Sequence, residues 1–366
     1  MKFKLRILGI RGVPGRHGGF ETFAEHLALY LVDRGWEVTV YNQEAGDGEY
    51  FQDEWQGIKR IHIPVSLSGA KGTVVFDWKS IVHASRSDAL VLTLGYNTAM
   101  FDLLFRLKGV PNIKNMDGLE WRRDKWGWFE KTWLYANERV ACWLANHLVA
   151  DHPKIKEHIE TRVKPSKVTM IPYGAPFIDS ADSALIENFG VKPCKYALVV
   201  ARPEPENSVL EIVRGFSKKE RGNDLVVLGD FDPAENSYHS EIIAAASHEV
   251  KFPGAVYSKP LINALRYYSR LYIHGHTVGG TNPSLVEALG AGSPVLAHDN
   301  EFNRWVAGEG GRYFVDEGEF ADCIDAILDD DDVLSKMTRA SRLRFEESFG
   351  WTRILEDYEQ LLANWA

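Results

Sequence analysis

The chain has 366 residues, a formal net charge of −9 at pH 7 and 45% hydrophobic residues, which indicates a globular protein and argues against nucleic acid as its main partner. Its length predicts two domains of roughly 150 to 200 residues each. Its three cysteines, Cys142, Cys194 and Cys323, have neither a metal-binding spacing nor the pattern of a disulfide framework. Since no apolar run is long enough to span a membrane and the basic start lacks a signal-peptide pattern, we expect a cytoplasmic protein.

Apolar runs alternate with helix-period segments in the first half of the chain. The predicted strands are residues 6–10, 36–42, 58–65, 89–95 and 112–117. Residues 20–35 predict an amphipathic helix that ends at Gly35. Strands separated by helices indicate a parallel sheet with helices on both faces.

The same pattern starts again at Lys195. The predicted strands there are 196–202, 224–230, 250–254 and 293–299, and the predicted helices are 207–219, 236–247 and 282–292. We therefore expect an α/β protein of two doubly wound, Rossmann-like domains that face each other across a cleft. Their predicted ranges are 1–180 for the first domain, 181–345 for the second, and 346–366 for a terminal helix that returns to the first.

In open α/β sheets, ligands bind at the turns that follow the strands. The first such turn, residues 11–20, is rich in glycine and contains Arg16, His17, Gly18, Gly19 and Phe20. A helix N-terminus after this turn favours an anion. The spacing is not that of a dinucleotide-binding loop, and the second strand ends at Asn42 rather than at an acid. The alternative is a turn that only packs the helix on the strand.

A second glycine turn precedes the predicted helix 282–292. Gly279 and Gly280 come first, and Asn282 and Pro283 are typical of the start of a helix. Glu287 lies one turn into this helix, where it can accept hydrogen bonds from the vicinal hydroxyls of a ribose. The alternative for Glu287 is a structural one, because an acid near a helix N-terminus also favours the dipole.

Four segments carry a resemblance. GVPGRHGGFETFAEHLALYLVDRGWEVTVY and GGTNPSLVEALGAGSPVLAHDNEFNRWV resemble the opening and the donor-binding segments of bacterial rhamnosyltransferases in glycosyltransferase family 4. VVARPEPENSVLEIVRGF is similar to the turn that opens the family's second domain, and MIPYGA to the hinge before it. The resemblance implies a GT-B fold, a nucleotide-sugar donor, retention at the anomeric carbon, and no obligatory metal or other cofactor.

The resemblance also implies roles for individual residues. Arg202 becomes the diphosphate-binding arginine, Glu287 the carboxylate on the ribose, and helix-start amides the contacts to phosphate. The donor-binding set is then Gly18, Gly19, Arg202, Asn207, Gly279, Gly280, Thr281, Asn282, Pro283, Ser284, Leu285 and Glu287. Two positions depart from the family pattern, since Asn207 stands where many members have lysine and Gly279 where many have glutamate. Lys259 or Arg266 could replace the missing charge, and the GGTNP form favours dTDP-L-rhamnose as the donor.

The chemistry needs negative charge stabilised on the departing phosphate, which Arg202 and helix N-termini can supply. A retaining transferase of this kind needs no carboxylate nucleophile, because the leaving phosphate can take the proton of the acceptor. Arg202, Asp117 and Glu287 are the predicted catalytic residues. Asp117 ends a strand, where it could orient the sugar or the acceptor hydroxyl, or only cap the next helix; Glu120 is a weaker candidate of the same kind.

Residues 121–150 combine five tryptophans with several lysines and arginines. Such a composition suits the headgroup region of an anionic membrane. The predicted acceptor or membrane face consists of Arg16, His17, Phe20, Glu120, Arg122, Arg123 and Lys125. The alternative is core packing, which we favour for the later half of the segment, including Trp133 and Trp143.

Together these observations predict a metal-independent, retaining glycosyltransferase. Its expected reaction moves L-rhamnose from dTDP-L-rhamnose to a lipid-linked saccharide in surface polysaccharide biosynthesis, with peripheral contact to the inner face of the cell membrane. Alternatives are a UDP- or GDP-sugar donor, a nucleotide-sugar 2-epimerase on the same scaffold, or a sugar-binding protein without catalysis.

Overall fold

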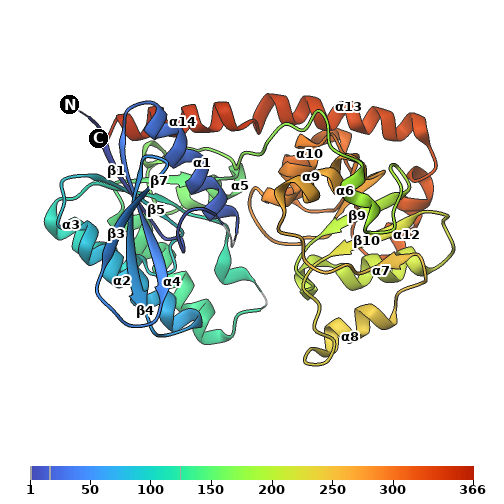
Figure 1. The fold of residues 1–366 in the computed structure, drawn as a ribbon, viewed down its shortest axis with the longest axis horizontal. Coiled ribbons are helices and arrows are strands. Elements are labelled where there is room, and N and C mark those ends of the chain that lie inside the picture. The colour runs from blue at the N-terminus through green and yellow to red at the C-terminus, as the bar shows by residue number, and fades with distance from the viewer. Residues whose placement is uncertain (1, 16–17, 124) are drawn as a thin grey trace. The chain divides into compact units, whose positions relative to one another are not determined.

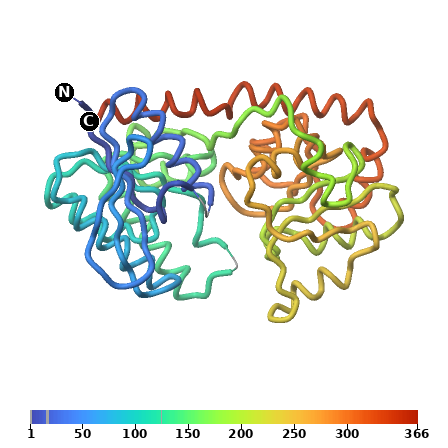
Figure 2. The backbone as a smooth tube through the Cα atoms, viewed as in Figure 1, coloured from blue at the N-terminus to red at the C-terminus, as the bar shows by residue number. Residues whose placement is uncertain are grey.

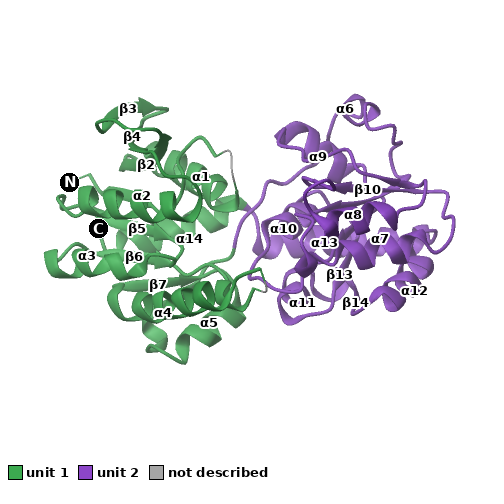
Figure 3. Ribbon diagram, turned by 90° about the horizontal axis from the view of Figure 1, so that it is seen from below, with its two compact units in different colours: residues 1–172, 351–366 green, residues 173–350 purple. Residues whose placement is uncertain are grey.

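The computed structural model describes residues 2–15, 18–123 and 125–366. The chain forms two compact units, residues 1–172 with 351–366 and residues 173–350, coloured separately in Figure 3. The sequence placed the first boundary at residue 180. Residues 173–180 instead belong to the second unit, because the N–H of Ala175 donates to the carbonyl of Phe349 (2.9 Å) and that of Ile178 to Gly290 (3.0 Å).

The first unit contains an eight-stranded sheet in the order β3-β4-β2-β1-β5-β6-β7-β8. All neighbours are parallel except β3 and β4. Its strands are β1 (Lys4–Leu8), β2 (Glu37–Ala45), β3 (Phe51–Trp55), β4 (Ile58–Val65), β5 (Leu90–Leu94), β6 (Asn112–Asn115), β7 (His147–Ala150) and β8 (Val168–Met170). Its helices are α1 (Gly19–Asp33), α2 (Gly69–Ala84), η1 (Ala99–Asp102), α3 (Leu103–Lys108), η2 (Glu120–Arg122), α4 (Trp128–Leu144), α5 (Pro153–Glu160), η3 (Pro165–Lys167) and α14 (Trp351–Ala363).

The first unit is built from both ends of the chain. Helix α14, red in Figures 1 and 2, lies beside the blue N-terminal segments. The ring of Tyr358 packs 4.6 Å from that of Phe23 on α1, and its hydroxyl accepts a hydrogen bond from Asn115 at the end of β6 (2.8 Å). These contacts are buried, so α14 is part of the core of this unit.

The second unit contains a six-stranded parallel sheet in the order β11-β10-β9-β12-β13-β14. Its strands are β9 (Tyr196–Val200), β10 (Asp224–Leu228), β11 (Val250–Lys251), β12 (Leu271–His274), β13 (Val295–His298) and β14 (Arg312–Phe314). Its helices are α6 (Ala184–Glu187), η4 (Pro205–Asn207), α7 (Val209–Ser217), α8 (Ser237–Ala244), α9 (Lys259–Tyr267), α10 (Pro283–Gly290), α11 (Glu301–Ala307), η5 (Gly308–Gly310), α12 (Glu317–Ile327) and α13 (Asp331–Ser348).

Alternate residues of β9 enter two separate cores. Tyr196 and Leu198 pack with α9 and α10, whereas Ala197 and Val199 pack with α7 and α12 on the other face of the sheet. A strand buried on both faces explains the continuous apolar run that predicted it. The predicted fold class, two Rossmann-like α/β domains, is confirmed. Among the residues described, no helix is long and apolar enough to cross a membrane.

Candidate active site

The glycine-rich turn after β1 is held in place by contacts within the first unit. Gly9 has a φ of 85°, and a Cβ there would lie 2.0 Å from the carbonyl oxygen of Leu94, so only glycine fits. The Asn42 side chain accepts from the N–H of Val13 (3.2 Å) and donates to its carbonyl (2.9 Å). Asn42, which in the sequence only counted against a ribose-binding acid, therefore anchors this turn.

Two carboxylates of α1 accept hydrogen bonds from backbone N–H groups of the same turn. Glu25 accepts from the N–H of Gly15 (2.6 Å), and Glu21 accepts from that of Arg11 (3.4 Å). These carboxylates also place negative charge next to the start of α1, which opposes a phosphate there. These contacts indicate that the turn has a fixed shape and does not itself bind an anion. Gly18, Gly19 and Phe20 lie at the start of α1, as predicted. The predicted residues 16 and 17 lie outside the described part of the chain.

The turn after β6 holds Asp117. Asp117 has a φ of 52°, and its N–H donates to the side chain of Asn115 (2.9 Å). The buried hydroxyl of Tyr96 accepts from the N–H of Glu120 (2.9 Å) and donates to the carbonyl of Gly118 (3.1 Å), which fixes the turn. The alternative of a helix cap does not hold, because η2 begins after Leu119 and has no side-chain cap.

Asp117 is chemically distinct from an ordinary surface carboxylate. Burial raises the pKa of Asp117 to about 6, and the charge of Glu120 adds to this, whereas the Gly118 amide, Arg123 and Lys125 act in the opposite direction. Glu120 itself pairs with Arg123 (3.2 Å). A carboxyl group with a pKa near neutrality can hold or accept a proton under physiological conditions.

The tryptophan-rich segment divides differently from the prediction. Trp121 packs on α4, with its ring edge-to-face on Tyr135 at 5.3 Å and its Nε1 donating to the buried Glu138 (2.5 Å). Arg122 remains exposed over the Trp121 ring. Trp143, predicted to face the core, is instead 75% exposed, because the buried residues of α4 lie on the other side of the helix.

In the second unit, the turn after β9 presents Arg202. The Arg202 side chain is 59% exposed and its Nη1 lies 3.4 Å from Glu204 Oε1. Asn207 is buried at 2% exposure, and its Nδ2 donates to the carbonyl of Arg202 (2.8 Å). The amide of Asn207 thus shapes the turn that carries Arg202, and its contact to the donor stays a prediction.

The start of α10 also differs from the prediction. Pro283 has no N–H, the N–H of Ser284 donates to Asn282 Oδ1 (3.0 Å), and the N–H of Leu285 donates to the Asn282 carbonyl (3.1 Å). The cap therefore occupies the amides that were predicted to bind phosphate. The N–H groups of Gly279, Gly280 and Asn282 form no hydrogen bond with any described residue. The amides available to an anion thus precede the helix, whereas Thr281 is buried.

Glu287 lies in an ion pair. Its Oε2 is 2.5 Å from Nη2 of Arg266, which is only 3% exposed. Arg266 is therefore not an exposed replacement for the charge missing at position 207; Lys259 is exposed at the start of α9. The Ser284 hydroxyl donates to the carbonyl of Val200 (3.2 Å), so α10 begins directly beside the end of β9.

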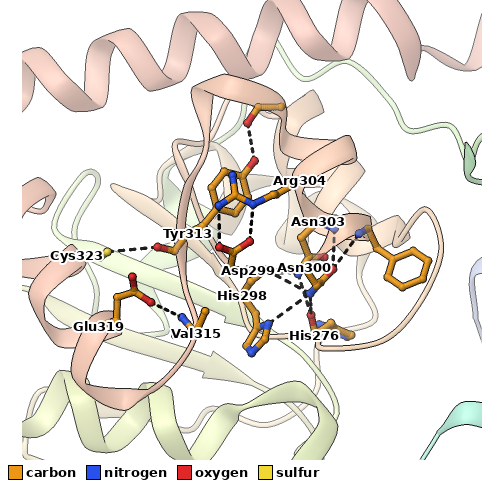
Figure 4. Close-up of polar contacts among 12 residues, drawn as sticks. His276, His298, Asp299, Asn300, Asn303, Arg304, Tyr313, Val315, Glu319 and Cys323 are labelled. Carbon is orange, nitrogen blue, oxygen red and sulfur yellow. Dashed lines mark hydrogen bonds and ion pairs between the residues drawn. The ribbon is translucent and has the colours of Figure 1, made fainter. Parts of the chain in front are cut away.

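Two histidines lie close together, His274 as the last residue of β12 and His276 just after it. The His274 and His276 rings stack at 4.2 Å, and both ring nitrogens of the buried His274 lack a hydrogen-bond partner within the described structure. Burial and the neighbouring histidines hold the pKa of His274 well below its usual range. Asn300 and Asn303 of the α11 start donate to the His276 carbonyl (3.0 and 2.8 Å), as Figure 4 shows. Sequence spacing gave no sign that these asparagines hold the turn.

The structure groups the predicted residues by unit. Arg202, Asn207 and the 279–287 segment lie at the carboxyl ends of the adjacent strands β9 and β12. Gly18, Phe20, Asp117 and Glu120 follow β1 and β6, on either side of β5. Within the described residues, no cluster of histidine, cysteine and acidic side chains is suited to hold a metal ion.

Two family models match the chain, one over most of each unit. Residues 187–344 match the family described as Glycosyl transferases group 1, and residues 2–176 match a domain of unknown function, DUF1972. Among curated protein sequences, none matches the chain.

Solved structures with the same fold cover almost the whole chain. Sucrose-phosphate synthase from Thermosynechococcus elongatus has a TM-score of 0.82 at 15% identity, covering 99% of both chains. Anabaena HepE in complex with UDP-glucose has a TM-score of 0.77 at 17% identity, again over 99% of both. An α,α-trehalose-phosphate synthase (UDP-forming) from Burkholderia vietnamiensis has a TM-score of 0.74 at 9% identity over all of both chains. The fold is that of the GT-B glycosyltransferases, and the second unit matches a glycosyltransferase family model.

Proposed function

We propose that the protein is a glycosyltransferase that transfers a sugar from a nucleoside diphosphate to a saccharide acceptor. The observation that carries the proposal is the polar edge of the second unit. There the amides of Gly279, Gly280 and Asn282, which form no hydrogen bond within the described residues, precede a helix that begins beside the end of β9, and the exposed Arg202 follows that strand. A row of amides with a guanidinium at the adjacent strand end is suited to a diphosphate.

Each group has a proposed role in the reaction. When the bond between the anomeric carbon and the diphosphate oxygen breaks, negative charge grows on that oxygen, and Arg202 and the amides before α10 stabilise it. Glu287, held by Arg266, accepts hydrogen bonds from the ribose hydroxyls. The departing phosphate oxygen takes the proton of the acceptor hydroxyl as that hydroxyl attacks on the same face. This route retains the anomeric configuration and needs neither a carboxylate nucleophile nor a metal ion.

We propose two candidate donors and one class of acceptor. The resemblance of the GGTNP segment favours dTDP-L-rhamnose as the donor, and the proposed acceptor is a lipid-linked saccharide of surface polysaccharide biosynthesis. HepE binds UDP-glucose and the trehalose-phosphate synthase is UDP-forming, so a UDP-sugar is the second candidate. The 2-epimerase alternative has no support from these relatives of the fold. We propose that Asp117 and Glu120 in the first unit orient the acceptor, and that the reaction takes place at the inner face of the cell membrane.

A donor panel tests the proposal. The purified protein is incubated with dTDP-, UDP- and GDP-sugars, and released nucleotide is measured together with calorimetric binding of each nucleotide. We expect slow, selective turnover of one donor, and an R202A variant to lose about 100-fold in kcat/KM. R312A, which removes an exposed arginine of β14 in the same unit, is the matched control and should retain full turnover. Failure of every nucleotide to bind would refute the proposed function.

A further inference from the structure

Helix α4 exposes large aromatic side chains along one side. Trp128, Phe129 and Trp143 are 82%, 69% and 75% exposed, and Tyr135 is also exposed. On a helix with 3.6 residues per turn, these positions and Arg139 fall on one half of the surface. We call these five residues the α4 aromatic face.

The opposite side of α4 is buried and mostly apolar, with Leu134, Ala141, Cys142 and Leu144, and it also contains Asn137 and Glu138. Asn137 accepts from the N–H of Met100 (3.0 Å) and donates to the carbonyl of Trp133 (3.0 Å). Glu138 binds Trp121 and His158, the latter at 2.9 Å, and pairs with Arg162. The inward side of α4 is thus packed and its polar side chains are satisfied inside the protein. The rings of Trp128, Phe129 and Trp143 lie on the outward side, where a helix of a globular protein usually carries polar residues, so packing of α4 in the first unit does not account for them.

A basic pocket lies at the C-terminal end of the same helix. Its volume is about 670 Å³, and its charged lining residues are Arg139, Arg162, Lys164 and Lys167, with no acidic residue among the lining and Trp143 at its edge. Lys167 donates to the carbonyl of Cys142 (2.8 Å), and Arg162 is neutralised by Glu138. Arg139 and Lys164 form no ion pair with a described residue. This uncompensated charge stands out in a chain with a net charge of −9.

Aromatic rings and cations beside each other match one kind of partner. Tryptophan and tyrosine prefer the boundary between lipid headgroups and acyl chains, and lysine and arginine beside them attract anionic headgroups. We propose that the α4 aromatic face and the basic pocket dock the protein on an anionic lipid bilayer, with the pocket receiving a lipid phosphate. The proposal deepens the proposed function by naming the surface through which the enzyme meets a lipid-linked acceptor.

This surface differs from the one that the sequence suggested. Arg123 pairs with Glu120 and the Trp121 ring packs on α4, so neither is available to a membrane. The proposed docking surface thus lies on the outward side of α4, whereas the exposed Arg122 and Lys125 of the 121–128 segment remain a prediction. Trp128, at its first residue, is common to both.

Vesicle sedimentation tests the docking surface without any sugar nucleotide. Full-length protein is mixed with phosphatidylcholine vesicles that contain or lack phosphatidylglycerol. We expect binding only to the anionic vesicles, about tenfold or more weaker for R139E/K164E and for W128S/W143S. The matched controls lie on the second unit: K192E/K195E reverses two exposed lysines, and Y257S removes a tyrosine that is 80% exposed. Both controls should bind like the unmodified protein, and all variants should keep the unmodified melting temperature because every changed side chain is exposed.

Three results would overturn the proposal. The first is equal vesicle binding by the α4 variants and the controls. The second is full displacement from vesicles by millimolar inorganic phosphate at constant ionic strength, which would assign the pocket to a free anion. The third is a dimer of the unmodified protein that W128S/W143S dissociates, since the rings would then cover a second copy. Nucleotide release in vesicle-free buffer measures the proposed function separately, so the failure of one does not imply the failure of the other.

Discussion

At the scale of single residues, Asp117 shows how a turn can give a common side chain a special role. The left-handed backbone at this position is unusual for a residue with a side chain, and bonds from Asn115 and Tyr96 hold the surrounding turn. Strain of this kind is frequent at functional sites. The backbone and the raised pKa together distinguish Asp117 from Glu120.

The titration of Asp117 predicts a pH profile. If its carboxylate orients the acceptor hydroxyl, kcat/KM should rise as the pH increases through about 6 and then level off, because the ionised form is the active one. D117N should lower kcat/KM about 100-fold and abolish this inflection. D88N, which changes an exposed aspartate of the same unit, is the control. An unchanged inflection in D117N would show that another group titrates.

The ion pair of Glu287 and Arg266 permits a test that separates structure from binding. E287Q leaves the buried Arg266 beside a neutral partner, so we expect the unfolding free energy of the second unit to fall by up to about 3 kcal/mol and nucleotide affinity to fall about tenfold. Replacing both residues by methionine removes the unpaired charge and should restore most of the stability, but not the affinity for nucleotide. Recovery of both in the double variant would show that Glu287 is purely structural.

At the scale of elements, Asp77 of α2 and Asp102 of η1 share the neighbourhood of one lysine, Lys114 of β6. Asp77 on α2 accepts from Thr98 (2.8 Å), and Asp102 pairs with the buried Lys114 (3.0 Å). Burial raises the pKa of Asp77 to about 6, with the charge of Asp102 acting in the same direction. This carboxyl is therefore most easily accommodated when it is protonated.

The raised pKa of Asp77 predicts the sign of a stability change. A folded-state pKa above the unfolded value means that the folded state binds this proton more tightly, so stability falls as the pH rises from about 4 through 6. D77N keeps the acceptor for Thr98 without the charge and should stabilise the first unit by roughly 2 to 3 kcal/mol at pH 8, with little effect at pH 4. Urea unfolding of both proteins at the two pH values measures this. Equal stabilisation at both would contradict the assigned cause.

The sequence predicted long apolar elements better than short or polar ones. β1, β5, β9 and α10 follow from apolar runs and from a helix start with Asn and Pro. β3 was missed because its FQDEW sequence is exposed at the sheet edge, where only pairing with β4 makes it a strand. β8 and β14 have three residues each, too few for any periodicity. In the site, Arg202 and Glu287 follow from motifs, but which amides the Asn282 cap occupies depends on geometry that spacing does not contain.

At the scale of the whole molecule, the last segment of the sequence belongs to the first unit. Residues 351–366 are the final ones in the sequence, yet they belong to the core around Phe23 and Asn115. The restart of the strand pattern at Lys195 was enough to predict two domains. The boundary at residue 172 was not predictable, because it depends on backbone bonds from Ala175 and Ile178 to residues far along the chain.

We propose that nucleotide binding belongs mainly to the second unit, and a substitution at Gly19 in the first unit tests this assignment. Amides of the 9–15 turn are bonded to Glu21, Glu25 and Asn42 in the first unit, whereas the unpaired amides and Arg202 are in the second. Nucleotide should therefore be held mainly by the second unit. G19L adds a bulky side chain at the first residue of α1, so we expect it to reduce transfer about 100-fold while nucleotide affinity changes by less than about twofold.

Two further variants serve as a comparison and a control for G19L. R202A should weaken nucleotide binding and transfer together, because its guanidinium acts on the diphosphate itself. G48L adds the same side chain at an exposed position of the first unit, where a Cβ atom would lie 3.6 Å from Cγ of Pro64, its nearest neighbour. This variant should change neither nucleotide affinity nor transfer. Calorimetry with free nucleotide and a transfer assay with the donor selected from the panel give both numbers for each protein. If G19L reduced nucleotide affinity and transfer equally, the turn after β1 would itself bind the donor, and the assignment of the diphosphate to the second unit alone would be wrong.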